Sequence, residues 1–170
     1  MASKLRVDSI LPVDGAPTNG GGGIIQVVQT IKKDQFTTAN NTSNYTDITG
    51  LNVTITPTRT DSKILIECSI YNSNANAVNF FRVLRGSTFI EQPSGTSSSG
   101  AGYNAHGFAY FDHSFQDTTV IKILDSPATT SSTTYKVQMA VTGATGTINK
   151  FYNTSNYYGI STIQLYEVSA

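Results

Sequence analysis

The residue types best suited to acid–base or metal chemistry gather in one segment, "HGFAYFDH" at residues 106–113. It holds both histidines of the chain, His106 and His113, together with Asp112. Imidazole and carboxylate groups can bind zinc or transfer protons. In a strand, however, successive side chains point to opposite faces, so Asp112 and His113 would diverge, as would the two histidines. We therefore predict polar positions on a partly exposed strand, with no metal ligands.

Other catalytic signatures are missing from the sequence. There is no G-x-S-x-G elbow, and "NGGGG" lacks the Lys-Ser/Thr ending of a phosphate loop and precedes an apolar run. The eleven acidic residues are scattered, so nothing nominates a carboxylate pair for glycoside hydrolysis. Cys68 is the only cysteine, on a strand face with Ile64, Ile66 and Ile70, and we expect a buried, inert thiol. The sequence predicts no enzyme activity, no catalytic residue and no cofactor.

Charge and hydropathy exclude two classes of partner. Eleven basic residues balance eleven acidic ones over 170 positions, and charged residues make up 13%. Because nucleic acids and anionic membranes require clustered Lys and Arg, we expect neither as a partner. No apolar run is long enough to cross a membrane, and the N-terminus lacks the apolar region of a secretory signal. We therefore expect synthesis in a cytoplasm and no membrane insertion.

Short alternating apolar segments follow one another from residue 24 onward, separated by turn residues, and none has a helical period with caps. Gly50 marks a bulge within one segment, and Gly86-Ser87 a tight connection. The pattern predicts an all-β jelly-roll β-sandwich over residues 24–170. The expected strands are 24–33, 45–57, 63–71, 77–86, 88–91, 106–115, 118–124, 134–141, 147–152 and 159–168.

Some of these strands are apolar on both faces. Phe80 and Phe81 must point to opposite faces, and the segment 159–168 carries apolar groups on each side. A two-layer sandwich in water needs only one apolar face per sheet. Part of the outer surface is therefore expected to be covered by other subunits.

Residues 1–23 form a separate extended arm. Pro12 and Pro17 interrupt regular structure, and Gly20–Gly23 provide a hinge. A tether alone would be polar throughout, yet this segment carries five apolar side chains. We predict that they anchor the arm on a partner surface, for instance by strand addition. They are Leu5, Val7, Ile10, Leu11 and Val13.

Two segments rich in Tyr, Asn, Ser and Gly are expected at loop tips, "SGTSSSGAGYNA" and "YNTSNYYG". Such a composition suits recognition of glycans or proteins, because tyrosine gives rigid contact area and Asn and Ser give adaptable hydrogen bonds. The candidate recognition residues are Tyr103, Asn104, Asn156, Tyr157 and Tyr158. The alternative is that both segments are ordinary surface loops.

Four stretches carry a family resemblance: "VDSILPVDGAPTNGGGGIIQVVQT", "YTDITGLNVTITPTRTDSKILI", "FRVLRGSTFI" and "LDSPATTSSTTYKVQM". Over nearly the whole chain, the sequence resembles small virion structural proteins of tailed bacteriophages, described as decoration or tail-fibre-like proteins. The resemblance implies a homotrimer of jelly rolls similar to tumour necrosis factor, with a projecting body and an anchoring N-terminal segment. It supplies no catalytic residues.

The resemblance leaves the position on the particle open. A compact body without a shaft favours a capsid decoration or cement protein on the virion surface, made in the host cytoplasm and anchored on the major capsid protein. The alternative is a tail-fibre tip or tail-attached host-attachment protein, bound to a tail or baseplate protein and recognising a host surface glycan or protein. A polysaccharide depolymerase is less favoured, because such enzymes use long repeat-built β-helices and no repeat is visible.

Overall fold

The computed structural model describes residues 23–39, 44–95, 104–113, 115–152 and 156–169, and these form strands and connections without a helix. The eleven strands are β1 (Ile24–Lys32), β2 (Phe36–Thr38), β3 (Thr46–Ile55), β4 (Lys63–Asn74), β5 (Ala77–Arg85), β6 (Thr88–Phe89), β7 (Gly107–Phe111), β8 (Phe115–Asp125), β9 (Thr133–Thr142), β10 (Gly146–Ile148) and β11 (Ser161–Val168).

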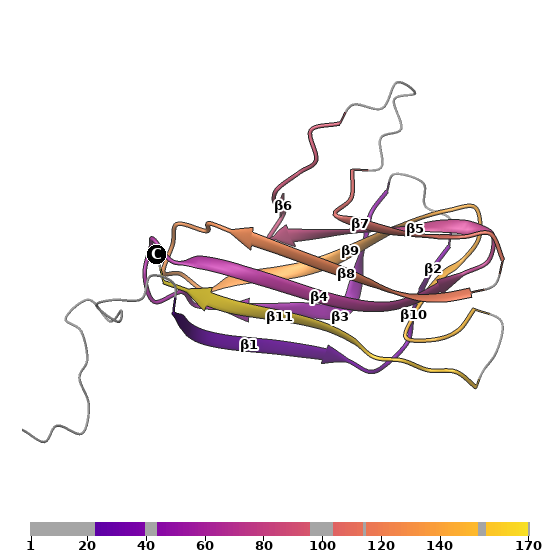
Figure 1. Ribbon diagram of the computed structural model, residues 1–170, viewed down its shortest axis with the longest axis horizontal. Helices are drawn as coiled ribbons and strands as arrows, with labels where there is room; N and C mark the ends of the chain where they lie inside the picture. Colours follow the sequence, from indigo (N-terminus) through magenta and orange to yellow (C-terminus); the bar gives the residue numbers. More distant parts are fainter. Residues whose placement is uncertain (1–22, 40–43, 96–103, 114, 153–155, 170) are drawn as a thin grey trace, which may run out of the picture.

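The strands form two antiparallel sheets packed face to face (Figure 1). The first sheet has the order β8–β4–β11–β1, and β10 and β2 continue it beside the far end of β4. The second sheet has the order β3–β9–β5, and β7 and β6 pair in succession along the other edge of β5. Because the chain crosses repeatedly between the sheets, this is the jelly-roll β-sandwich that the strand pattern predicts.

β4 is the central strand of the first sheet, paired with β8 along its whole length and with β11 and then β10 on its other side. Its alternating residues Ile64, Ile66, Cys68 and Ile70 are buried, as the sequence predicts. They pack against Phe81 and the other inward side chains of the second sheet in one continuous core. Apolar burial between the two sheets therefore holds the sandwich together.

The expected bulge lies in β3. Asp47 is opposite Gln138 and Asn52 is opposite Lys136, so five positions of β3 span two positions of β9. Gly50 has a φ of 78°, which glycine adopts without the clash that a Cβ would cause. The extra residues change the alternation, so that Ile48 and Leu51 both reach the core.

Most strand boundaries differ from the expected ones by one or more residues, β4 extends to Asn74, and one short strand was missed. The predicted strand 106–115 is wrong, because β7 pairs in the second sheet, β8 pairs in the first, and the chain changes sheets after Phe111. The strands expected at 147–152 and 159–168 are shorter, at 146–148 and 161–168. β2 has only three residues and pairs with β10, a long-range contact that no local pattern signals.

Asparagine side chains fill the interior at one end of the sandwich. Nδ2 of Asn79 donates to Oδ1 of Asn72 at 2.9 Å, and Nδ2 of Asn74 donates to Oδ1 of Asn79 at 2.7 Å. All three residues are fully buried. Asn72 and Asn74 continue the inward positions of β4, so the core face of that strand changes from apolar to hydrogen-bonded without leaving the interior.

Candidate functional site

The five predicted anchoring residues of the arm, Leu5, Val7, Ile10, Leu11 and Val13, lie outside the residues that the structure describes, and so does Tyr103. The other candidate recognition residues are divided between two regions. Asn156, Tyr157 and Tyr158 are exposed and adjacent, on the connection from β10 to β11. Asn104 precedes β7, where its carbonyl accepts a hydrogen bond from the hydroxyl of Tyr45 at 3.0 Å.

The two histidines do not form a common site. His106 is half-buried: its Nδ1 accepts the backbone N–H of Val83 at 2.9 Å, and its Nε2 lies 2.8 Å from the carbonyl of Ile90. Burial lowers the pKa of His106, and these contacts suit a neutral ring with its proton on Nε2. The role of His106 is to tie the segment after β6 to β5.

His113 and Asp112 contact each other, contrary to the expectation that they diverge. Nδ1 of His113 lies 2.8 Å from Oδ1 of Asp112, and both side chains are exposed in the turn between β7 and β8. The expectation was wrong because the strand ends at Phe111. Among the described residues, no group of three or more His, Cys, Asp or Glu side chains is placed to hold a metal ion.

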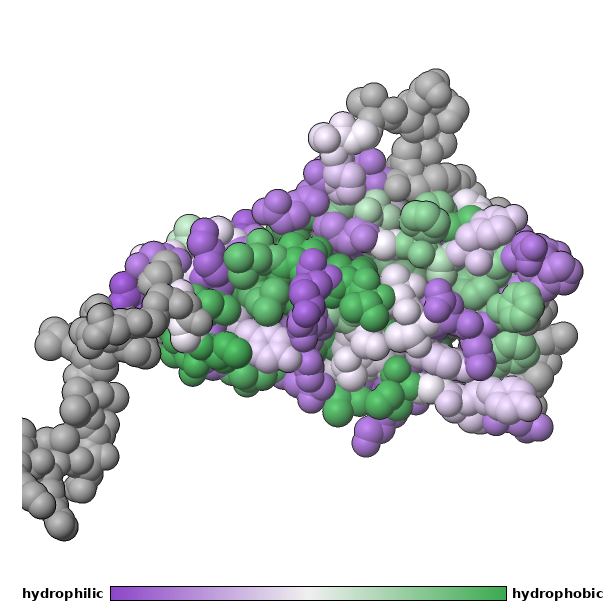
Figure 2. All heavy atoms as spheres, viewed as in Figure 1, coloured by the Kyte–Doolittle hydropathy of each residue, from purple (hydrophilic) through white to green (hydrophobic). Residues whose placement is uncertain are grey.

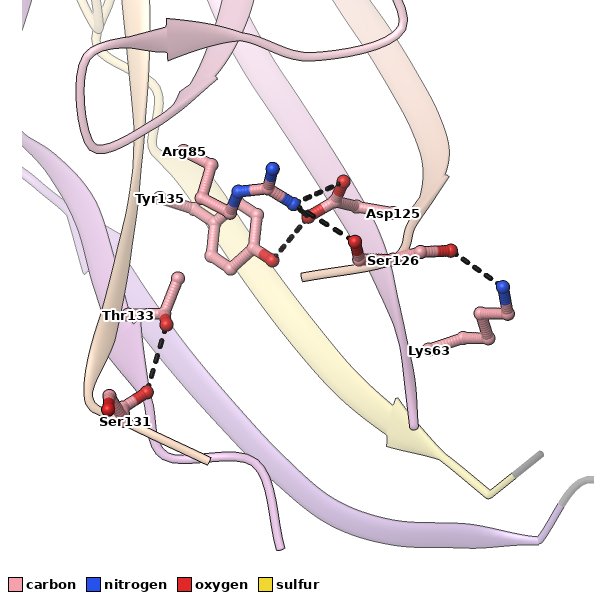
Figure 3. Close-up of polar contacts among 7 residues, drawn as sticks. All are labelled: Lys63, Arg85, Asp125, Ser126, Ser131, Thr133 and Tyr135. Carbon is pink, nitrogen blue, oxygen red and sulfur yellow. Dashed lines mark hydrogen bonds and ion pairs between the residues drawn. The ribbon is translucent and has the colours of Figure 1, made fainter. Parts of the chain in front are cut away.

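A polar cluster joins the two sheets at the end of β8 (Figure 3). Nη1 of Arg85 donates to both carboxylate oxygens of Asp125, at 2.9 and 2.7 Å, and the Tyr135 hydroxyl donates to the same carboxylate at 2.6 Å. Burial and then the bond to Asp125 raise the pKa of Tyr135. Because Tyr135 is fully buried and Asp125 nearly so, this cluster is inaccessible to a substrate and acts as a structural tie.

The outer face of the first sheet is the most unusual surface of the described residues. Its side chains form cross-strand rows that follow the strand register. The first row consists of Val27, Tyr166, Leu65 and Leu124, one residue from each of four neighbouring strands. Val27 and Leu124 are 54% and 52% exposed. A water-facing sheet surface is normally polar, so this exposed apolar row sets the face apart from an ordinary solvent-facing one.

The second row is polar and crosses the centre of the face. It consists of Gln29, Gln164, Glu67 and Lys122. Nζ of Lys122 and Oε1 of Glu67 are 2.5 Å apart. The hydrogen bond from Lys122 lowers the pKa of Glu67, and the same bond raises the pKa of Lys122. The two charges of the row therefore neutralise each other within the sheet.

The third row mixes apolar and small polar side chains. It consists of Ile31, Thr162, Ser69 and Val120, and the terminal members Ile31 and Val120 are 45% and 66% exposed. A hollow of about 180 Å³ lies between the second and third rows. Figure 2 shows this face, with apolar areas on both sides of a hydrophilic band that crosses the strands. Apolar surface thus flanks a neutral polar stripe.

A pocket of about 260 Å³ lies beyond the end of this face, where β8 begins and the connection from β10 to β11 returns. Phe115, Gln116, Phe151 and Tyr157 line it. The rings of Phe151 and Tyr157 meet edge to face, with centroids 6.1 Å apart. Of the candidate recognition residues, only Tyr157 lines this pocket; we call it the aromatic pocket.

Sequence reasoning missed most of both surfaces. Phe115 was assigned to the wrong strand, and Val120 and Leu124 were not singled out, although their spacing of four places them on one strand face. The signal that finds the outer face is the alternation in "TTVIKIL", where both sets of positions are apolar. The aromatic pocket unites residues 115–116 with 151 and 157, and no local pattern predicts that contact.

Comparison with known proteins gives a distant structural similarity alone. No family model matches the sequence, and no curated protein is similar to it. A structure of infectious bursal disease virus, Gt strain, aligns over 100% of this chain and 42% of the other, with 11% identity and a TM-score of 0.44. The VP2 subviral particle of the same virus aligns over 85% of this chain and 37% of the other, with 12% identity and a TM-score of 0.42. This chain therefore spans about two fifths of the length of those chains.

The described part of the chain contains no helix long and apolar enough to cross a membrane.

Proposed function

We propose that the protein is a non-enzymatic structural protein of a virus particle: a homotrimer docked on the particle surface through residues 1–23, as a capsid decoration protein of a tailed phage. The observation that carries the proposal is the apolar outer face of the first sheet. The trimeric state and the phage surface follow the sequence resemblance.

The outer face is suited to contact with another copy of the chain. Val27, Val120 and Leu124 are each more than half exposed, and burying such a side chain fully is worth about 1.5–3 kcal/mol. The three rows provide twelve outward side chains, about half of the 20–30 residues that a standard interface takes from each partner. Ile24 and Ile25, also exposed at the start of β1, extend the apolar surface toward the arm.

The charges of the face are compatible with being covered. An unpaired charge in an interface costs several kcal/mol, on the order of the penalty for a buried ion. Within the three rows, Glu67 and Lys122 already form a pair in one subunit, so a subunit that covers these rows need supply no counter-charge. A neighbour that excludes water from this face leaves a neutral, hydrogen-bonded row in its middle.

The arm supplies the contact with the particle in this proposal. Its five apolar residues precede a glycine hinge and then β1, so the described body and the arm meet at residue 23. Three arms on one trimer would act together through their effective concentration. In this proposal the arm binds the major capsid protein, and a tail or baseplate protein is the alternative partner.

Light scattering tests the trimer and its interface. We expect the purified protein to have about three times the 18.2 kDa mass of one chain, and the double variant Val120→Lys/Leu124→Lys to be monomeric. Tyr110→Lys is the matched control, because Tyr110 is 69% exposed on β7 of the other sheet. A monomeric wild-type protein at micromolar concentration contradicts the trimer, and a trimeric double variant places the interface elsewhere.

Deletion of residues 1–19 tests the arm separately. We expect a folded trimer that no longer joins the particle, measured by co-sedimentation with particles assembled without the protein. Incorporation at wild-type occupancy would show that the arm is not the anchor, and failure to fold would show that it belongs to the body.

A further inference from the structure

We propose that the aromatic pocket is a carbohydrate-binding site that takes one uncharged sugar ring of a glycan. This goes beyond the structural role and does not depend on the trimer. The pocket combines exposed aromatic rings with an amide group, and none of its lining residues, Phe115, Gln116, Phe151 and Tyr157, is charged.

The aromatic rings are exposed in a way that folding does not require. Phe115 and Tyr157 are each 59% exposed, and the neighbouring Tyr158 and Ile160 are exposed as well. Exposed aromatic side chains that gather at one end of a domain are a feature of interaction sites. The flat faces of such rings suit the C–H faces of a sugar ring, which are its apolar surfaces.

The hydrogen-bonding group of the pocket is held in place before any ligand binds. The Tyr71 hydroxyl lies 2.5 Å from Oε1 of Gln116 and donates a hydrogen bond to it. The amide oxygen is therefore held by Tyr71, and the amide nitrogen Nε2 points away from Tyr71. The ring of Tyr71 packs on Gly159 so closely that a Cβ there would lie 2.4 Å from it. An amide with one end fixed loses little entropy when its free end binds a sugar hydroxyl.

The backbone that carries the aromatic rings is also fixed. The N–H of Phe151 donates to the carbonyl of Tyr157 at 3.0 Å, and Lys150 pairs with Tyr158 in an antiparallel bridge. The N–H of Gly159 donates to the carbonyl of Asn149 at 3.3 Å. The two sides of the connection are thus joined like a short hairpin, and the edge-to-face contact of Phe151 and Tyr157 is preorganised.

The chemistry and the volume of the pocket limit the class and the size of ligand that it can bind. Its described lining residues carry no charge, so the pocket offers no counter-charge to a phosphate, a carboxylate or a metal ion. Its volume of about 260 Å³ lies below the roughly 300–1,000 Å³ of pockets for drug-sized ligands. One uncharged pyranose, with C–H faces for the rings and hydroxyls for Gln116, fits these properties.

Saturation-transfer NMR on the full-length protein tests the site, with glucose, galactose, mannose, N-acetylglucosamine and N-acetylgalactosamine as probes. We expect transfer to the ring protons of at least one sugar, and about tenfold weaker binding for Tyr157→Ala and Phe115→Ala, as expected when a central aromatic contact is removed. Tyr110→Ala is the control, since it removes an equally exposed ring on the other sheet and should leave binding unchanged.

Three results would overturn the proposal. They are no transfer to any of the five sugars, binding that Tyr157→Ala and Phe115→Ala leave unchanged, and a change of mass in light scattering for these two variants. The last result would assign the aromatic residues to a contact between subunits. Failure of the trimer or of the arm, measured separately, leaves the sugar-binding result intact.

Discussion

The hydroxyl oxygen of Tyr135 lies 2.6 Å from a carboxylate oxygen of Asp125, and this hydrogen bond joins the second sheet to the first. Arg85 holds the same carboxylate from the neighbouring strand of the second sheet. The two sheets are therefore joined at this end by a polar contact, in addition to the apolar core between them. The contact is buried on the Asp125 side and partly exposed at Arg85.

Replacing Asp125 should destabilise the sandwich more than removing one of its donors. We expect Tyr135→Phe to lower the free energy of unfolding by about 1 kcal/mol, because a single hydrogen bond is lost. Asp125→Ala should cost about 2–4 kcal/mol, because it leaves the guanidinium of Arg85 and the buried hydroxyl of Tyr135 without their acceptor. Urea unfolding at one protein concentration measures both values.

The control for Asp125 is Asp61→Ala. Asp61 forms an ion pair with Arg59 at 3.0 Å, but on the surface, and such pairs contribute about 0–1 kcal/mol. An Asp125→Ala variant that is no less stable than Asp61→Ala would show that the inter-sheet contact does not stabilise the fold.

Glu167 makes the free energy of unfolding depend on pH in the acidic range. Burial favours the neutral carboxyl, but hydrogen bonds from the N–H and the hydroxyl of Thr58, at 2.7 and 2.8 Å, and from Gln26 outweigh burial and lower the pKa of Glu167. Its contribution to stability is therefore complete above the unfolded value of 4.5 and is lost as pH falls through the lower folded pKa.

We expect Glu167→Gln to be less stable than the wild type at pH 7, by about 1–3 kcal/mol for the lost charged hydrogen bonds. The difference should shrink as pH falls below 4.5. Thermal unfolding between pH 7 and pH 3 gives the comparison, with Glu91→Gln at an exposed position as control. A stability gap that stays constant down to pH 3 would contradict the role of the ionised carboxylate.

Gly159 is required where the chain passes over Tyr71. A Cβ at this position would lie 2.4–2.8 Å from three atoms of the Tyr71 ring. We expect Gly159→Ala to lower the free energy of unfolding by about 1–3 kcal/mol, the usual cost of forcing extra volume into a packed site. Gly95→Ala, where a Cβ would meet nothing within 4 Å, should have little effect in the same thermal-unfolding measurement.

Asn79 should be the most sensitive member of the buried asparagine cluster. It donates to Asn72 and to the carbonyl of Ser73, and it accepts from Asn74. Asn79→Ala leaves these buried groups without partners, at about 1–3 kcal/mol, and we expect faster hydrogen exchange at the end of β4. Asn52→Ala, on an exposed position of β3, is the control, and equal exchange in both variants would refute the prediction.

The strand pattern was readable from the sequence wherever alternation was local. In β4 the inward positions Ile64 to Ile70 alternate with polar or half-exposed residues, so period and burial agree. The end of that strand was missed because Asn72 and Asn74 look like loop residues, although their even positions continue the inward set. Glu167 follows the same rule, since it continues the inward positions of Ile163 and Leu165.

The candidate sites were less predictable, because each depends on contacts between distant segments. The excess of apolar residues on both faces was visible in the sequence, but the rows appear only when Val27 aligns with Tyr166, Leu65 and Leu124 through three strand pairings. The recognition role given to Tyr157 and Tyr158 rested on loop composition. Phe115 and Gln116, which line the pocket together with Tyr157, come from β8, and composition cannot reveal that contact.

The reactivity of the buried Cys68 thiol reports how often the two sheets separate. Burial raises its pKa to about 12, so at neutral pH the buried sulfur is a protonated thiol and a poor nucleophile. Its side chain lies in the core between the two sheets, so exposure requires the sheets to separate. Because the chain has a single cysteine, the rate at which a thiol reagent labels the native protein measures how often its sheets come apart.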